Sequence, residues 1–321
     1  MIKIGVFGAG HLGKTHLKLA EASKELDLIG FYDPNPETVN SIDFSKKHKA
    51  FKSSEALIEA VDIVDIVTPT SSHFELARKA ILAKKHVFIE KPLTNTVKEA
   101  KSLIELAETE GVLGQVGHVE RFNPAFQAVL PSLTNPKFIE THRLSEFNPR
   151  GTDVSVILDL MIHDIDIVLS VVNSPIKNIH ASGVAVISET PDISNARIEF
   201  ENGCVANFTA SRISLKKMRK SRFFQKNAYI VLDYLTKQVE VVKMKDVGPD
   251  SYEDLTLLLT NAEGEKKQIY FENPTIKNTN PIQEELEHFA HCIQANKTPE
   301  VSLRDGARAL EVAYQIIDKI G

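Results

Sequence analysis

The sequence has little of what marks exported, membrane-spanning or nucleic-acid-binding proteins. Two cysteines in 321 residues are too few for a disulfide framework or a cysteine-based zinc site. The chain begins with a strand-like run instead of a signal peptide, and its apolar stretches fall far short of the roughly 18 residues that a membrane-spanning helix needs. The formal net charge is −5, and no basic tract is long enough to bind nucleic acid. We therefore expect a cytoplasmic protein without a metal site, a nucleic-acid partner or a membrane partner.

The first part of the chain alternates short β-branched runs with longer helical patterns. This alternation predicts a doubly wound parallel sheet of the α/β Rossmann class. Its length suits two domains, and we assign residues 1–118 to a nucleotide-binding Rossmann domain. The predicted strands lie at 2–7, 28–32, 63–67, 87–89 and 112–116, and the predicted helices at 56–60, 75–83 and 98–110.

Residues 119–321 show a different pattern and are assigned to a second, substrate-binding and oligomerisation domain. Segments in which apolar and polar residues alternate predict an α+β domain with a large open, mainly antiparallel sheet, and Asn202-Gly203 predicts a hairpin between two of its strands. One face of this sheet is left to be covered, which predicts a homodimer or homotetramer. The predicted helices lie at 125–130, 156–172, 282–293 and 303–320, and the predicted strands at 138–147, 196–201, 204–210, 229–234, 239–244 and 255–259.

A glycine-rich loop directly follows the first predicted strand and opens a helix. Gly8, Gly10 and Gly13 have the spacing of the dinucleotide fingerprint, in which glycines let the backbone approach a pyrophosphate at a helix N-terminus. The segment from Gly8 to Thr15 also has the spacing of a P-loop. Asp33 lies about twenty residues after Gly13, where a carboxylate binds the adenosine ribose, and it favours the dinucleotide. Because its charge repels a 2′-phosphate, NAD is favoured over NADP.

Lys91 lies at the carboxyl edge of the predicted sheet, where doubly wound folds bind ligands. With Glu90 beside it, a lysine there can relay protons near a bound cofactor. A solvated lysine at a strand end is the alternative interpretation.

Asp159 and His163 are four residues apart on the apolar helix predicted over 156–172, and therefore share one face. A carboxylate and an imidazole on one face suit substrate-hydroxyl binding and proton relay. A buried structural histidine is the alternative. A metal fragment would need further ligands, which the sequence does not provide.

In chain order, the glycine loop, residues 68–73, Glu90-Lys91-Pro92 and the spacing of Asp159 and His163 resemble the Gfo/Idh/MocA family. This family groups glucose-fructose oxidoreductase, inositol dehydrogenase and MocA as NAD(P)-dependent sugar oxidoreductases. The resemblance covers essentially the whole chain and implies that Lys91, Asp159 and His163 act around a sugar hydroxyl. It also implies that an open C-terminal sheet forms an oligomer interface. The cofactor-binding residues that it implies are Gly8, Gly10, His11, Leu12, Gly13, Asp33, Thr68, Pro69, Thr70, His73, Glu90 and Lys91.

Within this family, residues 117–124 and 153–166 are most similar to enzymes that oxidise the 3-hydroxyl of UDP-N-acetylhexosamines. Arg121, Arg143 and Arg150 suit a diphosphate, or they form structural salt bridges. We expect an NAD-dependent sugar or nucleotide-sugar dehydrogenase. A dehydrogenase of a free cyclitol or monosaccharide and a non-catalytic NAD-binding sensor are the alternatives. The implied substrate-binding residues are Lys91, His118, Arg121, Asn123, Arg150, Asp159 and His163.

Overall fold

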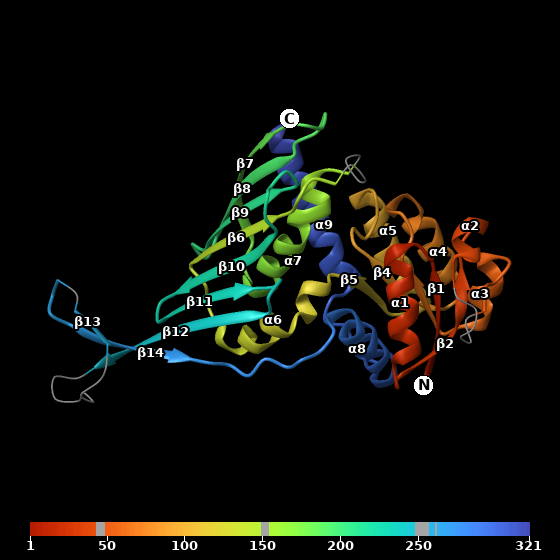
Figure 1. Ribbon diagram of the computed structural model, residues 1–321, viewed down its shortest axis with the longest axis horizontal. Coiled ribbons are helices and arrows are strands. Elements are labelled where there is room, and N and C mark those ends of the chain that lie inside the picture. Colours follow the sequence, from red (N-terminus) through yellow and green to blue (C-terminus); the bar gives the residue numbers. More distant parts are fainter. Residues whose placement is uncertain (43–48, 149–153, 248–256, 261) are drawn as a thin grey trace. The chain divides into compact units, whose positions relative to one another are not determined.

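Five strands form a parallel sheet in the N-terminal part of the chain, in the order β2-β1-β3-β4-β5 (Figure 1). Strands β3 and β4 are buried along almost their whole length, and such strands read in sequence as continuous apolar runs. The predicted doubly wound class is confirmed. The strands are β1 (Ile2–Phe7), β2 (Leu26–Tyr32), β3 (Ile63–Ile66), β4 (His86–Glu90) and β5 (Gly114–Gly117).

The helices between these strands begin and end at recognisable capping residues. Helix α5 starts with a capping box, in which the side chains of Thr96 and Glu99 each accept a hydrogen bond from the other residue's N–H. It ends at Gly111, whose φ of 68° is left-handed. The helices are α1 (His11–Ala22), α2 (Pro36–Asn40), α3 (Ser54–Ala60), α4 (His73–Leu82) and α5 (Val97–Glu110).

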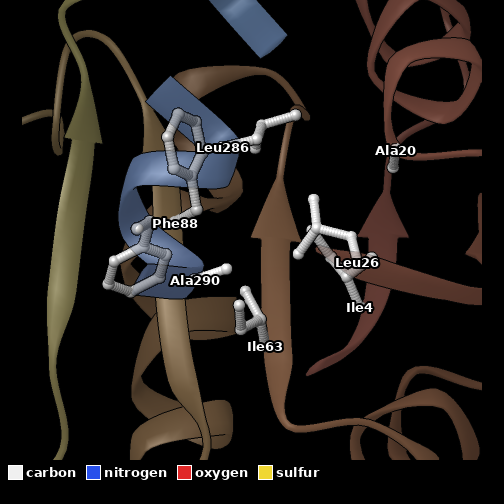
Figure 2. Packing of buried hydrophobic residues seen from close by; sticks show 8 residues of the cluster. Ile4, Ala20, Leu26, Ile63, Phe88, Leu286 and Ala290 are labelled. Carbon is white, nitrogen blue, oxygen red and sulfur yellow. The ribbon is translucent and has the colours of Figure 1, made fainter. Parts of the chain in front are cut away.

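The C-terminal part of the chain returns to this sheet. Helix α8 (Pro281–Ala295) packs against α1 and β4. Its residues Leu286 and Ala290 lie beside Phe88 and Ile63 in one buried apolar cluster (Figure 2). The core around the parallel sheet is therefore completed by a segment that follows the second sheet in the sequence.

The structure describes residues 1–42, 49–148, 154–247, 257–260 and 262–321, and they divide into two compact units. The first comprises Met1–Phe122 and Thr279–Val312, and the second comprises Asn123–Asn278 and Ala313–Gly321. The predicted boundary after residue 118 lies close to the division at Phe122. The segment Thr279–Val312 is expected from the sequence in the second domain, but it groups with the first unit.

The second unit contains a nine-stranded sheet in the order β13-β14-β12-β11-β10-β6-β9-β8-β7 (Figure 1). All neighbouring strands are antiparallel except β6 and β9, which are parallel. The predicted large, mainly antiparallel sheet is confirmed, and Asn202-Gly203 lies between β8 and β9 as predicted. Strands β7, β10 and β14 were not predicted. The strands are β6 (Phe138–Leu144), β7 (Ile176–Val184), β8 (Ile193–Phe200), β9 (Val205–Ser211), β10 (Met218–Gln225), β11 (Ala228–Asp233), β12 (Gln238–Val247), β13 (Leu257–Thr260) and β14 (Lys266–Glu272).

Helices α6 (Pro124–Val129) and α7 (Ile162–Val171) lie on one side of this sheet (Figure 1). A π-helical turn, Ile157–Met161, precedes α7, where the sequence predicts one uninterrupted helix over 156–172. Helix α9 (Leu303–Ile320) begins in the first unit and ends in the second. Among the described helices, none is both long and apolar enough to span a membrane.

Candidate active site

The carboxyl ends of the five parallel strands bring most of the predicted cofactor residues to one edge of the first unit. Gly8 follows β1, Asp33 follows β2, Thr68 lies just after β3, and Lys91 follows β4. The strand order reverses between β1 and β3. In open α/β sheets, ligands bind outside the carboxyl ends at such a reversal. The fold therefore places a ligand site at the glycine loop.

The backbone of the glycine loop requires glycine at two positions and leaves open space at a third. A Cβ on Gly8 would lie 2.7 Å from the Val67 carbonyl oxygen, and one on Gly13 would lie 2.0 Å from the Gly8 carbonyl oxygen. Gly10 has no atom within 4 Å of its ideal Cβ position, and no side chain caps α1 at this residue. The first-turn N–H groups of a helix have no intrahelical partners, so this open space suits a pyrophosphate.

The carboxylate of Asp33 is fixed beside this loop by two backbone groups. Its Oδ2 accepts a hydrogen bond from the N–H of Ala9 at 2.8 Å, and its Oδ1 accepts one from the N–H of Asn35 at 2.9 Å. Carboxylate oxygens have further acceptor sites, which can receive ribose hydroxyls. His11 and Leu12 form the exposed start of α1. These groups fit a dinucleotide without a 2′-phosphate, which is NAD.

His73 ties two turns of this edge together. Its Nε2 lies 2.9 Å from the carbonyl oxygen of Thr68, and its Nδ1 lies 3.0 Å from that of Pro92. Burial lowers the pKa of His73, so the neutral ring donates to one of these oxygens at a time. Pro69 and Thr70 lie within the first of the two turns. The ring is buried and acts on the site by holding these turns.

Lys91 lies at the start of the second turn, and its peptide bond to Pro92 is cis. Its backbone N–H donates to Oε2 of Glu90 at 3.1 Å. Its side chain is part-buried. The predicted position of Lys91 at the carboxyl end of β4 is confirmed, and Glu90 holds its peptide.

Three buried ionisable residues that the sequence alone does not single out lie around Glu90. His16 contacts both Asp65 and Glu90, and Glu285 on α8 is fully buried. Glu285 lies between Ile282 and Leu286 on the apolar face of its helix, so the helical spacing was a signal that could have found it. A P-loop protein also needs a strand carboxylate that faces a magnesium ion. Asp65 on β3 is the candidate for that role, and it is buried against His16, so the P-loop interpretation gains no support here.

The second unit holds the predicted aspartate and histidine pair. Asp159 is exposed on the π-helical turn, and His163 is part-buried near the start of α7. The N–H of Asp159 donates to the carbonyl of Ser155 at 2.9 Å. Single π-turns within helices are frequent at functional sites. This turn therefore presents Asp159 to solvent directly before the apolar part of the helix.

The predicted substrate residues His118, Arg121 and Asn123 have buried side chains. His118 and Arg121 are buried in the first unit, and Nη1 of Arg121 lies 3.8 Å from Oε1 of Glu300. Asn123 caps α6, because its Oδ1 accepts from the N–H of Ala125 and its Nδ2 donates to the carbonyl of Tyr234. Arg150 lies outside the described residues.

Arg143 forms a buried two-bond ion pair with Asp164. Nε donates to Oδ2 at 3.0 Å and Nη2 donates to Oδ1 at 2.9 Å. Both side chains are 3% exposed. Of the two interpretations of this arginine, the structure supports the salt bridge and not the diphosphate contact.

Within the described ranges, no group of three His, Cys, Asp or Glu residues could hold a metal ion. The carboxyl edge of the parallel sheet in the first unit carries the groups that suit a bound dinucleotide, with Lys91 beside them.

Comparisons with known proteins agree with this fold. Residues 2–118 match an oxidoreductase family with an NAD-binding Rossmann fold, and residues 97–225 match the GFO/IDH/MocA C-terminal domain. UDP-N-acetylglucosamine 3-dehydrogenase of Acidithiobacillus ferrooxidans is 36% identical over 241 residues, which are 75% of this chain and 76% of that enzyme. The solved structure of UDP-N-acetylglucosamine 3-dehydrogenase GnnA from this species gives a TM-score of 0.88 at 31% identity, covering 99% of this chain and 97% of that one.

More distant relatives act on cyclitols. Myo-inositol 2-dehydrogenase of Thermotoga maritima is 25% identical and is matched over 98% of this chain and 94% of that enzyme. Apo scyllo-inositol dehydrogenase from Lactobacillus casei shares the fold, with a TM-score of 0.77 at 19% identity over 100% of this chain and 96% of that one. The chain belongs to the Gfo/Idh/MocA family of NAD-dependent oxidoreductases.

Proposed function

We propose that this enzyme oxidises the 3-hydroxyl of a UDP-N-acetylhexosamine to a ketone. The observation that carries the proposal is the placement of Lys91 on the same sheet edge as the glycine loop and Asp33. The similarity to a UDP-N-acetylglucosamine 3-dehydrogenase supports this substrate class.

In this proposal, the glycine loop and its neighbours bind the cofactor. The N–H groups of the first turn of α1, from His11 to Gly13, bind the pyrophosphate, since Gly10 leaves room for its approach. Asp33 binds the ribose hydroxyls. Thr68 and Thr70 contact the cofactor from the turn after β3. When bound, NAD⁺ accepts the hydride that leaves the substrate carbon.

Either Lys91 or His163 takes the proton of the sugar hydroxyl as the C–H bond breaks. Lys91 follows a buried strand and has its backbone held by Glu90, which limits its positions relative to the cofactor edge. Asp159 is exposed and four residues before His163, so its carboxylate accepts a hydrogen bond from a substrate hydroxyl and orients the sugar. His118, Arg121 and Asn123 are further proposed substrate contacts.

The test is NADH formation from NAD⁺ and UDP-N-acetylglucosamine, with the keto product trapped. Lys91→Ala and His163→Ala are compared with Lys98→Ala, which removes an exposed lysine on α5. We expect turnover by the wild type and by Lys98→Ala, and a loss of at least about a hundredfold in the variant that lacks the base. Full turnover by the double variant Lys91→Ala/His163→Ala would refute the mechanism.

A free cyclitol is the second candidate substrate, since the enzyme is also similar to myo-inositol 2-dehydrogenase. Inhibition by free UDP separates the two candidates. A site for a nucleotide sugar is expected to bind UDP in competition with the substrate, whereas a cyclitol site is insensitive to UDP. Turnover of inositol without inhibition by UDP would favour the cyclitol.

We also propose that the enzyme is a cytoplasmic homodimer or homotetramer. Its two cysteines are free and buried, as is usual in a reducing compartment. On β6, β10 and β11, Phe138, Phe224 and Tyr229 alternate with fully buried neighbours and therefore share the opposite face of the sheet. Such a partly exposed aromatic group suits an interface between copies. Light scattering tests this, and a monomeric mass would refute the oligomer.

A further inference from the structure

Four ionisable side chains form a buried cluster inside the first unit, behind Lys91. They come from four different elements: His16 from α1, Asp65 from β3, Glu90 from β4 and Glu285 from α8. His16, Asp65 and Glu285 are 0% exposed and Glu90 is 9% exposed. Burying ionisable groups costs free energy unless they are paired or neutral. The four side chains are therefore expected to be paired with one another or protonated.

His16 lies between two carboxylates. Its Nδ1 is 2.9 Å from Oδ2 of Asp65, and its Nε2 is 3.4 Å from Oε1 of Glu90. The Nδ1 contact with Asp65 is a hydrogen bond, whereas Nε2 has no hydrogen-bond partner among the described residues and meets Glu90 as a contact between charged groups. Carboxyl groups on both sides of the ring favour the imidazolium. Burial opposes this charge, but Asp65 and then Glu90 raise the pKa of His16 well above its usual value. His16 is therefore charged at neutral pH.

Glu90 is held on three sides. Its Oε1 faces His16, its Oε2 accepts the N–H of Lys91 at 3.1 Å, and the backbone of Gly117 lies against the carboxylate. A Cβ on Gly117 would come within 2.8 Å of Oε1 and 3.1 Å of Oε2. Glycine at this position on β5 is thus required for the carboxylate to occupy its place.

Glu285 completes the cluster, and its surroundings favour the protonated acid. Neither of its carboxylate oxygens has a hydrogen-bond partner among the described residues. Burial, together with the charges of Glu90, Asp65 and Glu120, raises the pKa of Glu285 well above its usual value, while His16 opposes this rise.

We propose that His16 is a positioning residue for the reaction: as an imidazolium between Asp65 and Glu90, it fixes the Glu90 carboxylate against the peptide of Lys91. The inference rests on the proposed function in taking Lys91 as a residue that contacts the substrate. A displacement of about 1 Å in a reacting group can cost about a hundredfold in rate. We call the contact between the Glu90 carboxylate and the Lys91 N–H the Glu90 clamp. Loss of this clamp is expected to lower the rate of turnover.

The groups around the cluster set its dependence on pH. Glu120 faces it from the 3₁₀ turn Val119–Phe122, His73 from α4 also feels the charge of Glu90, and Gln115 from β5 donates to the backbone carbonyl of Glu285. Because the pKa of His16 is raised, its charge is lost only as the pH rises through that value. We expect the Glu90 clamp to weaken at alkaline pH and to be intact at neutral pH.

The experiment uses two substitutions of His16 that differ in which contact they retain. In His16→Asn the amide nitrogen takes the place of Nδ1 and keeps the contact to Asp65, whereas in His16→Gln it takes the place of Nε2 and keeps the contact to Glu90. His86→Asn, at the other end of β4, is the control. The first readout is hydrogen exchange of the Lys91 amide, which requires no substrate. We expect at least about tenfold faster exchange in His16→Asn than in the wild type, and little change in His16→Gln and His86→Asn.

Turnover is the second readout. In His16→Asn, kcat is expected to fall by about ten- to a hundredfold while KM changes little, and His16→Gln is expected to restore most of it. If His16→Asn does not fold, Glu90→Gln weakens the same contact and is expected to accelerate Lys91 exchange.

Unchanged exchange in His16→Asn, or in Glu90→Gln where that variant replaces it, would overturn the positioning role whatever the activity. So would an equal loss of kcat in His16→Gln and His16→Asn. If exchange responds as expected but the wild type oxidises no sugar, the proposed function fails and the clamp on Lys91 stands. The protonation of Glu285 has its own check, because Glu285→Gln, which copies the neutral acid, is expected to unfold at the same urea concentration as the wild type at pH 7.

Discussion

Replacing Arg143 by methionine tests whether the buried ion pair between Arg143 and Asp164 stabilises the second unit. The guanidinium forms two hydrogen bonds with Asp164, and both side chains are 3% exposed. Methionine retains most of the volume but leaves the Asp164 carboxylate buried without its cation. Removing one partner of a buried pair costs about 3–5 kcal/mol.

The expected loss is large enough to measure directly. With an m value of about 3 kcal/mol/M in urea, the unfolding midpoint falls by about 1–1.7 M. Arg143→Met/Asp164→Asn removes the stranded charge as well and is expected to recover about half of the loss. The matched control is Lys243→Met, which breaks the 2.7 Å ion pair with Glu272. That pair is partly exposed, so its loss is expected to cost no more than about 1 kcal/mol.

Equilibrium urea unfolding, followed by circular dichroism, compares the four proteins. If Arg143→Met is no less stable than Lys243→Met, the ion pair does not stabilise the unit as argued. If the double variant is as unstable as the single one, the loss does not come from a stranded charge. A higher KM for UDP-N-acetylglucosamine with unchanged stability would instead support the diphosphate interpretation of Arg143.

Further predictions concern the glycine loop, Asp33 and Asp192. Gly13→Ala places a methyl group 2.0 Å from a backbone oxygen and is expected to lower both the melting temperature and the affinity for NADH. Gly10→Ala adds its methyl group in open space and is expected to keep the wild-type melting curve while NADH affinity falls by at least about tenfold. If the two variants behave alike in thermal melting and in NADH titration, this difference between the two glycines is contradicted. Asp33→Ser is expected to improve the kcat/KM ratio for NADP⁺ over NAD⁺ by at least about tenfold, and an unchanged ratio would remove the charge argument. Although burial opposes it, three backbone N–H donors lower the pKa of Asp192; its contribution to stability is therefore present above the unfolded-state pKa of about 4 and lost as the pH falls below it. Asp192→Asn is expected to flatten unfolding free energy against pH below pH 4, and parallel curves for variant and wild type would exclude this origin.

The strands of the first unit were predicted within a few residues because buried parallel strands leave a local signal. The run Ile63 to Val67 is apolar except for Asp65, and it forms β3. In the second unit, the sequence does not predict β10, because its residues from Met218 to Arg222 are mostly basic or polar. This segment forms a strand because it pairs with β6 and β11 in the folded sheet.

The candidate site was predictable where function depends on a position along the chain. Asp33 and Lys91 lie at strand ends, which periodicity locates. Partners that meet only through folding were not predictable: Arg143 and Asp164 come from a strand and a helix. The π-helical turn before α7 cannot be predicted from the sequence either. One extra residue in a helical turn hardly changes the spacing of the apolar residues along the helix.

The place of α8 in the first unit has a consequence for how the protein is made. Leu286 and Ala290 pack into the same cluster as Ile4 and Phe88, yet the ribosome synthesises them after nearly the whole chain. The nucleotide-binding unit therefore cannot complete its core during early translation, and a nascent chain ending near Phe122 displays apolar surface that α8 later covers. Such a fragment is expected to bind an apolar dye, and addition of a peptide spanning α8 is expected to reduce the signal; a fragment that binds no dye would show that its core closes without α8.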